Sequence, residues 1–205
     1  MKKILFLAIV LCSAVSVAQG KFEQGMGKAM QAWKEGKPDD AVALLERIAI
    51  AEPTQWLPDY YVAFITTLAS FESRDQEQNA RRFVRAQNAL DAALMKTGEN
   101  DELHVLQALL YTARIVADPM TNGMTYSPKV MEHYNKALAI NPENPRAVFG
   151  KAEFEINSAR FFGKDISGMC GEVRRSITLF EKEKPSGFMP SWGRDRAAEV
   201  LKNCK

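Results

Sequence analysis

The 205-residue chain has few of the residue types that build catalytic or metal sites. It contains two histidines, His104 and His133, and three cysteines, none at the short spacing of a zinc site. No cluster joins a nucleophile to a base and an orienting group, and Gly163-Lys164-Asp165 lacks the Ser or Thr that follows the lysine of a phosphate loop. We therefore expect no enzyme, no cofactor and no metal. The catalytic alternative is a metal site of the two histidines with Glu102 or Glu132.

Long apolar runs are also missing beyond the start of the chain. Ile4 to Leu11 is apolar but too short to span a bilayer. Lys2 and Lys3 precede it, and Ser16-Val17-Ala18 places small residues where a signal peptidase reads them. Residues 1–18 are therefore predicted to be a Sec signal peptide, and the protein to be periplasmic or secreted, with no integral membrane span after cleavage.

The remaining chain, residues 19–205, lacks an excess of either charge. Removing the two leader lysines from 27 basic residues leaves 25, against 25 acidic residues. No broad field would attract nucleic acid, so we expect no nucleic-acid partner. Cys170 and Cys204 remain, an even number that permits a disulfide in an exported chain.

Alternation typical of strands is absent, and the chain is rich in Ala, Leu, Glu, Lys and Gln. An apolar pattern recurs four times, 45, 44 and 43 residues apart, with anchors at Ala41, Ala86, Val130 and Val173. Each copy predicts two helices joined by a turn. After the third copy, Pro142 ends one helix, Asn144 caps the next, and Pro145 takes its first position.

Two stretches carry a family resemblance: residues 33–41 (Trp-Lys-Glu-Gly-Lys-Pro-Asp-Asp-Ala), and Tyr134, Ala137, Leu138 and Pro142. On these residues the chain resembles the tetratricopeptide repeat. The resemblance covers residues 19–205 and implies an all-α solenoid of about four helical hairpins with a C-terminal capping helix. In the first copy it implies a helix that ends at Gly36, and a second that opens at Asp39 or Asp40.

The period exceeds the family's roughly 34 residues, and the extra residues lie inside the hairpins, at one edge of the stack. Phe71 to Asn79 is charged and is expected to lengthen its helices. Asp118 to Pro128 contains two prolines and Asn-Gly, and is expected to form a loop. Phe161 to Asp165 is expected to lead to a second break around Gly168 and Gly171.

Two surfaces are candidate binding sites. The family's first helices line a concave groove, and the resemblance places there Met26, Met30, Trp33, Tyr60, Phe64, Thr67, Val105, Leu109, Thr112, Phe149, Glu153 and Ile156. The family's carboxylate clamp of Lys and Asn is absent. An apolar groove suits an amphipathic helix, an apolar peptide, a second copy or a segment of this chain. Alternatively, these side chains simply form the core.

The rival surface is the insertion edge, which gathers adaptable apolar residues. Its candidates are Met120, Asn122, Met124, Tyr126, Phe161, Phe162 and Met169. Alternatively, these residues pack over the hairpin ends. At the tail, Cys170 and Cys204 are expected where antiparallel helices meet, which favours a disulfide between them. Trp192 is expected to plug the last repeat.

These patterns predict an exported scaffold that binds a protein or peptide of unknown identity, with a homo-oligomer possible. The alternative is a protein that binds a small apolar or carbohydrate ligand between the groove aromatics.

Overall fold

A computed structural model describes residues 20–204, so the expected signal peptide lies outside the described part. All regular structure in these residues is helical. A helix over residues 20–34 is followed by α2 (Pro38–Ala51), α3 (Leu57–Glu72), α4 (Gln76–Thr97), α5 (Asp101–Ala117), α6 (Pro119–Ile140), α7 (Pro145–Phe161), α8 (Ser167–Lys182) and α9 (Arg194–Lys202). Among them, no helix has the length and apolar character that a membrane crossing needs.

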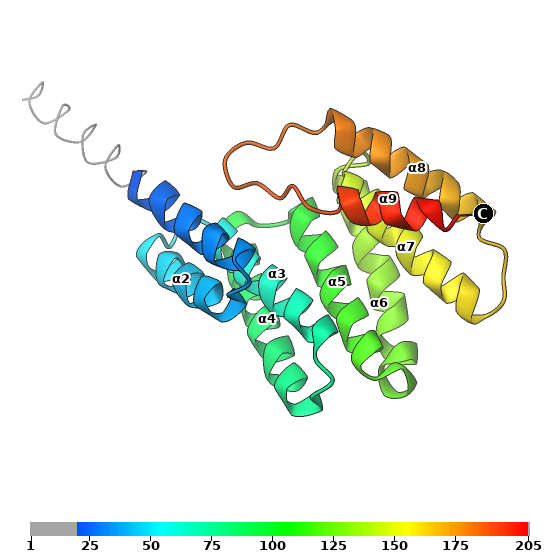
Figure 1. Ribbon diagram of the computed structural model, residues 1–205, viewed down its shortest axis with the longest axis horizontal. Helices are drawn as coiled ribbons and strands as arrows, with labels where there is room; N and C mark the ends of the chain where they lie inside the picture. Colours follow the sequence, from blue (N-terminus) through cyan, green and yellow to red (C-terminus); the bar gives the residue numbers. More distant parts are fainter. Residues whose placement is uncertain (1–19, 205) are drawn as a thin grey trace, which may run out of the picture.

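Successive helices pair as hairpins, and the hairpins stack along the molecule (Figure 1). The helix over 20–34 pairs with α2, α3 with α4, α5 with α6, and α7 with α8, and α9 packs against α8. The predicted all-α solenoid of four hairpins with a C-terminal helix is confirmed.

Capping residues explain where the helices begin. The Asn144 side chain accepts hydrogen bonds from the backbone N–H groups two and three residues on, at 2.9 and 3.0 Å, and Pro145 opens α7 as expected. The first hairpin differs, because α2 begins at Pro38 rather than at Asp39 or Asp40. Proline is preorganised for the first helical position, and the two acidic residues then lie in the first turn, where the helix dipole favours them.

The expected loop from Asp118 to Pro128 is wrong, because α6 runs through it. Asp118 caps this helix by accepting from the Thr121 backbone N–H at 3.1 Å, and Pro119 takes the first helical position. Pro128 lies inside the helix on its exposed side, where water can hydrogen bond the carbonyl that its missing N–H leaves free. Both prolines that predicted a loop are therefore accommodated in one helix.

The other two insertions have different outcomes. Extension of α3 and α4 absorbs most of Phe71 to Asn79, as predicted. After α7 the chain turns at Gly163, which has a positive φ of 65°. The second break expected around Gly168 and Gly171 is wrong, because both glycines lie within α8.

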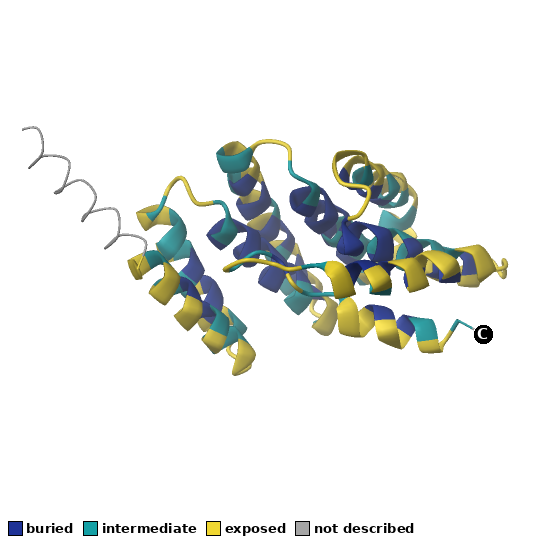
Figure 2. Ribbon diagram, turned by 90° about the horizontal axis from the view of Figure 1, so that it is seen from above, coloured by how far each residue is buried: buried dark blue, intermediate teal, exposed yellow. Residues whose placement is uncertain are grey.

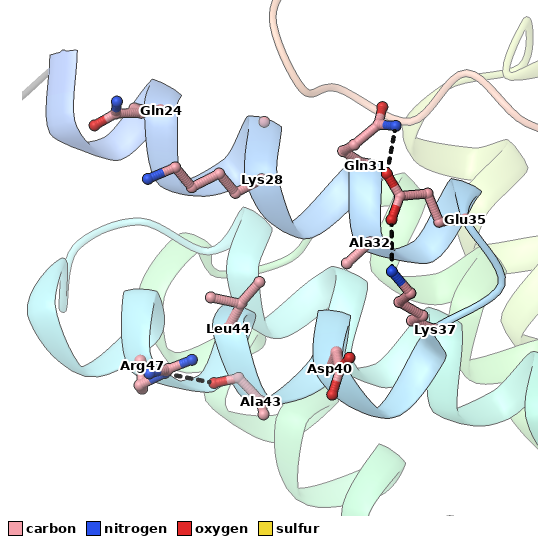
Figure 3. Close-up of a pocket in the computed structure, with 11 residues that line it drawn as sticks. Gln24, Lys28, Gln31, Ala32, Glu35, Lys37, Asp40, Ala43, Leu44 and Arg47 are labelled. Atoms are coloured by element: carbon pink, nitrogen blue, oxygen red, sulfur yellow. Dashed lines mark hydrogen bonds and ion pairs between the residues drawn. The ribbon is translucent and has the colours of Figure 1, made fainter.

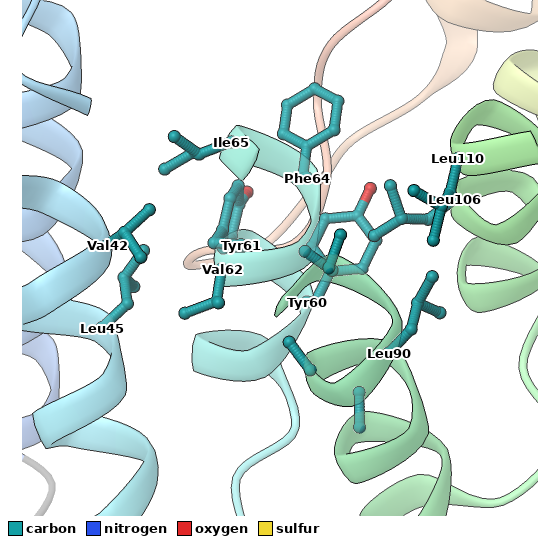
Figure 4. Packing of buried hydrophobic residues seen from close by; sticks show 14 of the residues in the cluster. Val42, Leu45, Tyr60, Tyr61, Val62, Phe64, Ile65, Leu90, Leu106 and Leu110 are labelled. Atoms are coloured by element: carbon teal, nitrogen blue, oxygen red, sulfur yellow. The ribbon is translucent and has the colours of Figure 1, made fainter. Parts of the chain in front are cut away.

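Helix α3 forms the centre of the core. Every residue from Pro58 to Thr67 is buried, because α3 packs against α2, α4 and α5. Figure 2 shows the buried residues gathered on the inner sides of the stacked helices and the exposed residues on their outer sides. Figure 4 shows Tyr60 facing Leu106 of α5, while Val62 faces α2. Side chains on opposite faces of α3 thus join the first hairpin to the third.

The segment between α8 and α9 covers part of this core. We call residues 183–193 the strap. It leaves the end of α8, reaches back toward the N-terminal hairpin, and returns to α9 (Figure 1). Trp192 at its end packs on Phe64 of α3, so the expectation that it plugs the last repeat is wrong. The strap brings the C-terminal part of the chain across to the second repeat.

Candidate functional site

The predicted groove positions divide by burial. Seven of them are buried and unavailable to a ligand: Met26, Tyr60, Phe64, Thr67, Val105, Phe149 and Ile156. Met30, Trp33 and Leu109 are half-buried. For these seven buried positions, the structure shows the alternative in which the side chains form the core.

The strap occupies the groove over α3. The Trp192 ring stacks on Phe64 with centroids 4.7 Å apart, and its Nε1–H donates to the Tyr60 hydroxyl at 2.8 Å. The Tyr61 hydroxyl donates to the Phe188 backbone carbonyl at 2.9 Å. A segment of this chain, one of the four expected occupants, therefore lies on the aromatic face.

Helix α9 covers the groove over α7. Arg196 on α9 pairs with Glu153 at a groove position, with Nε and Oε1 2.7 Å apart. The end of α9 is fixed by a disulfide between Cys170 and Cys204, whose Cα atoms are 5.8 Å apart. The predicted disulfide is confirmed, and it links the start of α8 to the end of the described chain.

A pocket remains between the strap, α3 and the N-terminal helix. Its volume is about 430 Å³, within the range of small-molecule sites. It is lined by Met30, Trp33, Tyr61, Gly187, Phe188, Met189, Ser191 and Trp192. No charged side chain lines it, and burial raises the pKa of Tyr61 to about 12, so this phenol stays neutral at physiological pH. We call this the strap pocket.

Only two of the eight residues that line this pocket are among the predicted groove residues. Met30 and Trp33 were predicted as groove residues, whereas Tyr61 and the strap residues were missed. Tyr61 lies one position from the expected groove register at Tyr60 and Phe64. No local pattern signals that residues 187–192 fold back on α3, because the partners are 127 and 132 positions apart.

A buried charge network holds the base of the strap. The Arg146 side chain on α7 is only 4% exposed, and its Nε lies 2.8 Å from Oε2 of Glu102 on α5. Its Nη1 donates to Glu183 at the start of the strap at 3.0 Å. Burial lowers the pKa of Arg146, but the hydrogen bonds that it donates to Glu183 and Glu102 outweigh this effect and raise its pKa. Burial raises the pKa of Glu102, and Arg146 offsets that rise only in part.

The insertion edge carries four strongly exposed large apolar side chains. Met120 and Met124 are 92% exposed, Phe161 is 83% exposed and Phe162 is 69% exposed. Asn122 instead turns inward and donates to the Arg114 carbonyl at 2.7 Å. These apolar side chains leave a large unpartnered surface at this edge.

Tyr126, the remaining predicted edge residue, has partners within the fold. Its ring stacks on Tyr111 of α5 with centroids 5.2 Å apart. Lys129 lies over both rings, with its Nζ 5.4 Å from the Tyr126 centroid. Tyr126 is thus better placed for packing than for recognition.

A cleft of about 460 Å³ adjoins the insertion edge. Helices α6, α7 and α8 form it, and its lining includes Met131, Phe154, Phe162, Lys164 and Met169. Lys164 and Glu155 place opposite charges on its lining. We call this the insertion cleft.

A larger hollow of about 660 Å³ lies between the N-terminal helix and α2 (Figure 3). Its rim is polar, with Glu35 accepting hydrogen bonds from Gln31 and Lys37 at 2.9 Å each. A polar outer face is what the first repeat of a solenoid needs where no further repeat covers it. We therefore interpret this hollow as the N-terminal end of the stack.

The two histidines do face each other. Nδ1 of His104 lies 3.1 Å from Nδ1 of His133, and Glu99 approaches the other nitrogen of His104 at 2.5 Å. Neither expected carboxylate joins them, since Glu102 pairs with Arg146 and Glu132 with Lys136. Within residues 20–204, no three His, Cys, Asp or Glu side chains gather to hold a metal ion.

Together these features define an all-helical solenoid whose own C-terminal segment lies across the aromatic part of its concave face. Among solved structures, the chain is similar to the HusA haemophore from Porphyromonas gingivalis, with a TM-score of 0.80 and 24% sequence identity over 90% of this chain and 92% of that chain. No protein-family model and no curated relative matches the sequence. The likeness shows the fold, and the tetratricopeptide resemblance stays a prediction.

Proposed function

We propose that this protein binds a flat, largely apolar small molecule of the porphyrin class in the strap pocket. The observation that carries the proposal is the lining of aromatic rings and methionine side chains without a charged group. Such a lining suits a broad apolar ring system, which gains from both burial and stacking. The fold neighbour supports this choice of ligand class, because it is named a haemophore.

The residues of the strap pocket also bear on how a porphyrin would be held. Trp33 and Trp192 both line the pocket, so their rings are available to stack on the ligand. No histidine or cysteine lines it, and the methionines Met30 and Met189 are soft, weakly accepting ligands. We expect ring contacts to dominate, so that haem and metal-free protoporphyrin bind with similar Kd values.

An absorbance titration with both porphyrins tests the proposal. Trp33→Leu removes a lining ring, and loss of about 1.4 kcal/mol of stacking corresponds to about a tenfold rise in Kd. Trp56→Leu is the matched control, because Trp56 is half-buried against Tyr60 but does not line the pocket. Equal Kd values for the two folded variants would contradict this site.

The second candidate function is a protein-binding scaffold that uses the insertion edge. It is favoured by the four exposed side chains of Met120, Met124, Phe161 and Phe162. Co-purification of envelope proteins with the wild type and with a Met124→Ser, Phe161→Ser variant tests it. Undiminished recovery of every partner by the variant would remove this candidate.

Export itself stays a prediction, to which the disulfide adds support.

A further inference from the structure

The strap has the form of a loop whose two ends meet at one side chain. Glu183 at its start accepts a hydrogen bond from Nη1 of Arg146 at 3.0 Å. Gly193 at its end lies against the same arginine, since a Cβ atom built there would be 3.6 Å from Cγ of Arg146 and 2.9 Å from Cζ of Phe180. Compact surface loops whose ends lie close together are frequently functional.

The base of this loop is firmly held. Arg146 is buried and pairs with carboxylates on α5 and on the strap, so it resists displacement. The Gly193 backbone has a positive φ of 107°, a conformation that suits glycine and fixes the entry into α9. The disulfide of Cys204 then ties α9 to α8. These contacts hold both ends of the strap, at Glu183 and at Gly193.

The tip of the loop is held much less firmly. Phe188 contacts the opposite wall through its carbonyl, which accepts from the Tyr61 hydroxyl, and through its ring, which meets Phe22 edge-on at 6.4 Å. The residues from Lys184 to Gly187 are exposed. Trp192, nearer the base, is instead stacked on Phe64 and hydrogen-bonded to Tyr60. Contacts are thus fewest at the exposed residues 184–187, whereas Phe188 packs against the core and Pro190 is buried.

We propose that residues 184–190 form a lid on the strap pocket, which pivots on the base at Arg146 and is latched by the hydrogen bond from Tyr61 to Phe188. This inference rests on the proposed function, because it assigns the lid to control of ligand entry and release at that site. Phe188 and Met189 line the pocket from the strap, whereas Trp33 and Tyr61 line it from the body of the protein. Opening the tip separates these two walls, and closing it brings Phe188 over the ligand.

The Tyr61→Phe variant removes the latch donor and keeps the ring. Hydrogen–deuterium exchange of the ligand-free protein is expected to quicken about fivefold in peptides that cover residues 184–190, and to stay unchanged elsewhere. Stopped-flow release of metal-free protoporphyrin is expected to quicken by a similar factor. Tyr111→Phe is the matched control, since this half-buried tyrosine on α5 does not line the strap pocket and contacts Tyr126 instead.

Unchanged exchange at residues 184–190 in the Tyr61→Phe variant would overturn the lid, and so would quicker exchange spread evenly over the chain. Exchange is measured without ligand, so this result does not depend on the proposed function. Failure of the wild type to bind protoporphyrin would overturn the proposed function and the lid's role in release. Faster exchange with unchanged ligand release would also overturn that role.

Discussion

Replacing Arg146 by methionine is expected to have a large effect on stability. The substitution keeps a long side chain but removes the partner of Glu102, whose side chain is only 6% exposed. Leaving one member of a buried ion pair uncompensated costs about 3–5 kcal/mol. A domain of this kind has about 5–15 kcal/mol in total, so Arg146→Met is expected to take a substantial share of the free energy of unfolding.

The free energy of unfolding of the same variant is expected to fall as the pH rises. Burial already raises the pKa of Glu102 above its usual value of 4.5, and Arg146 opposes that rise. Without Arg146, the pKa of Glu102 in the folded chain would rise further above its value in the unfolded chain. The contribution of protonated Glu102 to the free energy of unfolding is therefore fully present below the unfolded pKa, and it is lost as the pH rises through the folded pKa. The deficit of Arg146→Met should grow from pH 4.5 upward.

Urea unfolding at several pH values measures both effects. Arg196→Met is the matched control, because Arg196 pairs with Glu153 while its side chain is 55% exposed, and an exposed pair contributes about 0–1 kcal/mol. Adding Glu102→Gln to Arg146→Met removes the stranded charge and should restore part of the loss. A deficit below about 1 kcal/mol, or no recovery in the double variant, would refute the reasoning.

Three further changes have expected outcomes. Gly150→Ala would place a methyl carbon 2.5 Å from the buried Tyr134 hydroxyl, so thermal unfolding should show a loss of about 1–3 kcal/mol, whereas Gly171→Ala, with open space, should gain up to about 1 kcal/mol. Replacing both bonded cysteines by serine opens a loop with a sequence separation of 34, and should cost about 3–4 kcal/mol in denaturant titrations. Burial, then the neighbouring histidine, lowers the pKa of His133 to about 4. The contribution of neutral His133 to the free energy of unfolding is present above pH 6.5 and is lost as the pH falls toward 4. The loss should be about 1–2 kcal/mol after allowance for solvent screening. His133→Gln should abolish this dependence of stability on pH. An unchanged thermal stability of Gly150→Ala would contradict the first prediction, and an unchanged free energy of unfolding of the serine variant the second. An unchanged dependence of stability on pH in His133→Gln would contradict the third.

Local signals predicted the scaffold well. Asn144 and Pro145 define the start of α7 through backbone chemistry that a few neighbouring residues determine. The pairing of Cys170 with Cys204 followed from their places at helix ends. Proline was the less reliable guide, because its effect depends on position. At the first turn, Pro119 favours a helix. Pro128 is tolerated inside the helix because the carbonyl four residues earlier, which loses its hydrogen bond, faces solvent.

The strap pocket depends on contacts that no local pattern contains. Met30 and Trp33, two of the predicted groove residues, line one wall of this pocket, whereas Phe188 and Trp192 of its other wall lie at the far end of the sequence. Only the folded chain shows that the strap crosses α3, because exposed loop residues such as Lys184 to Gly187 carry no periodicity. An apolar groove indicates that something covers it, but not which segment does so.

Backbone amide chemical-shift mapping with metal-free protoporphyrin tests the central claim most directly. The strap-pocket account predicts the largest shifts at Met30, Trp33 and Tyr61 and at the strap residues Gly187, Phe188, Met189, Ser191 and Trp192. Shifts confined to the insertion cleft, at residues 127–131 and 154–164, would contradict it.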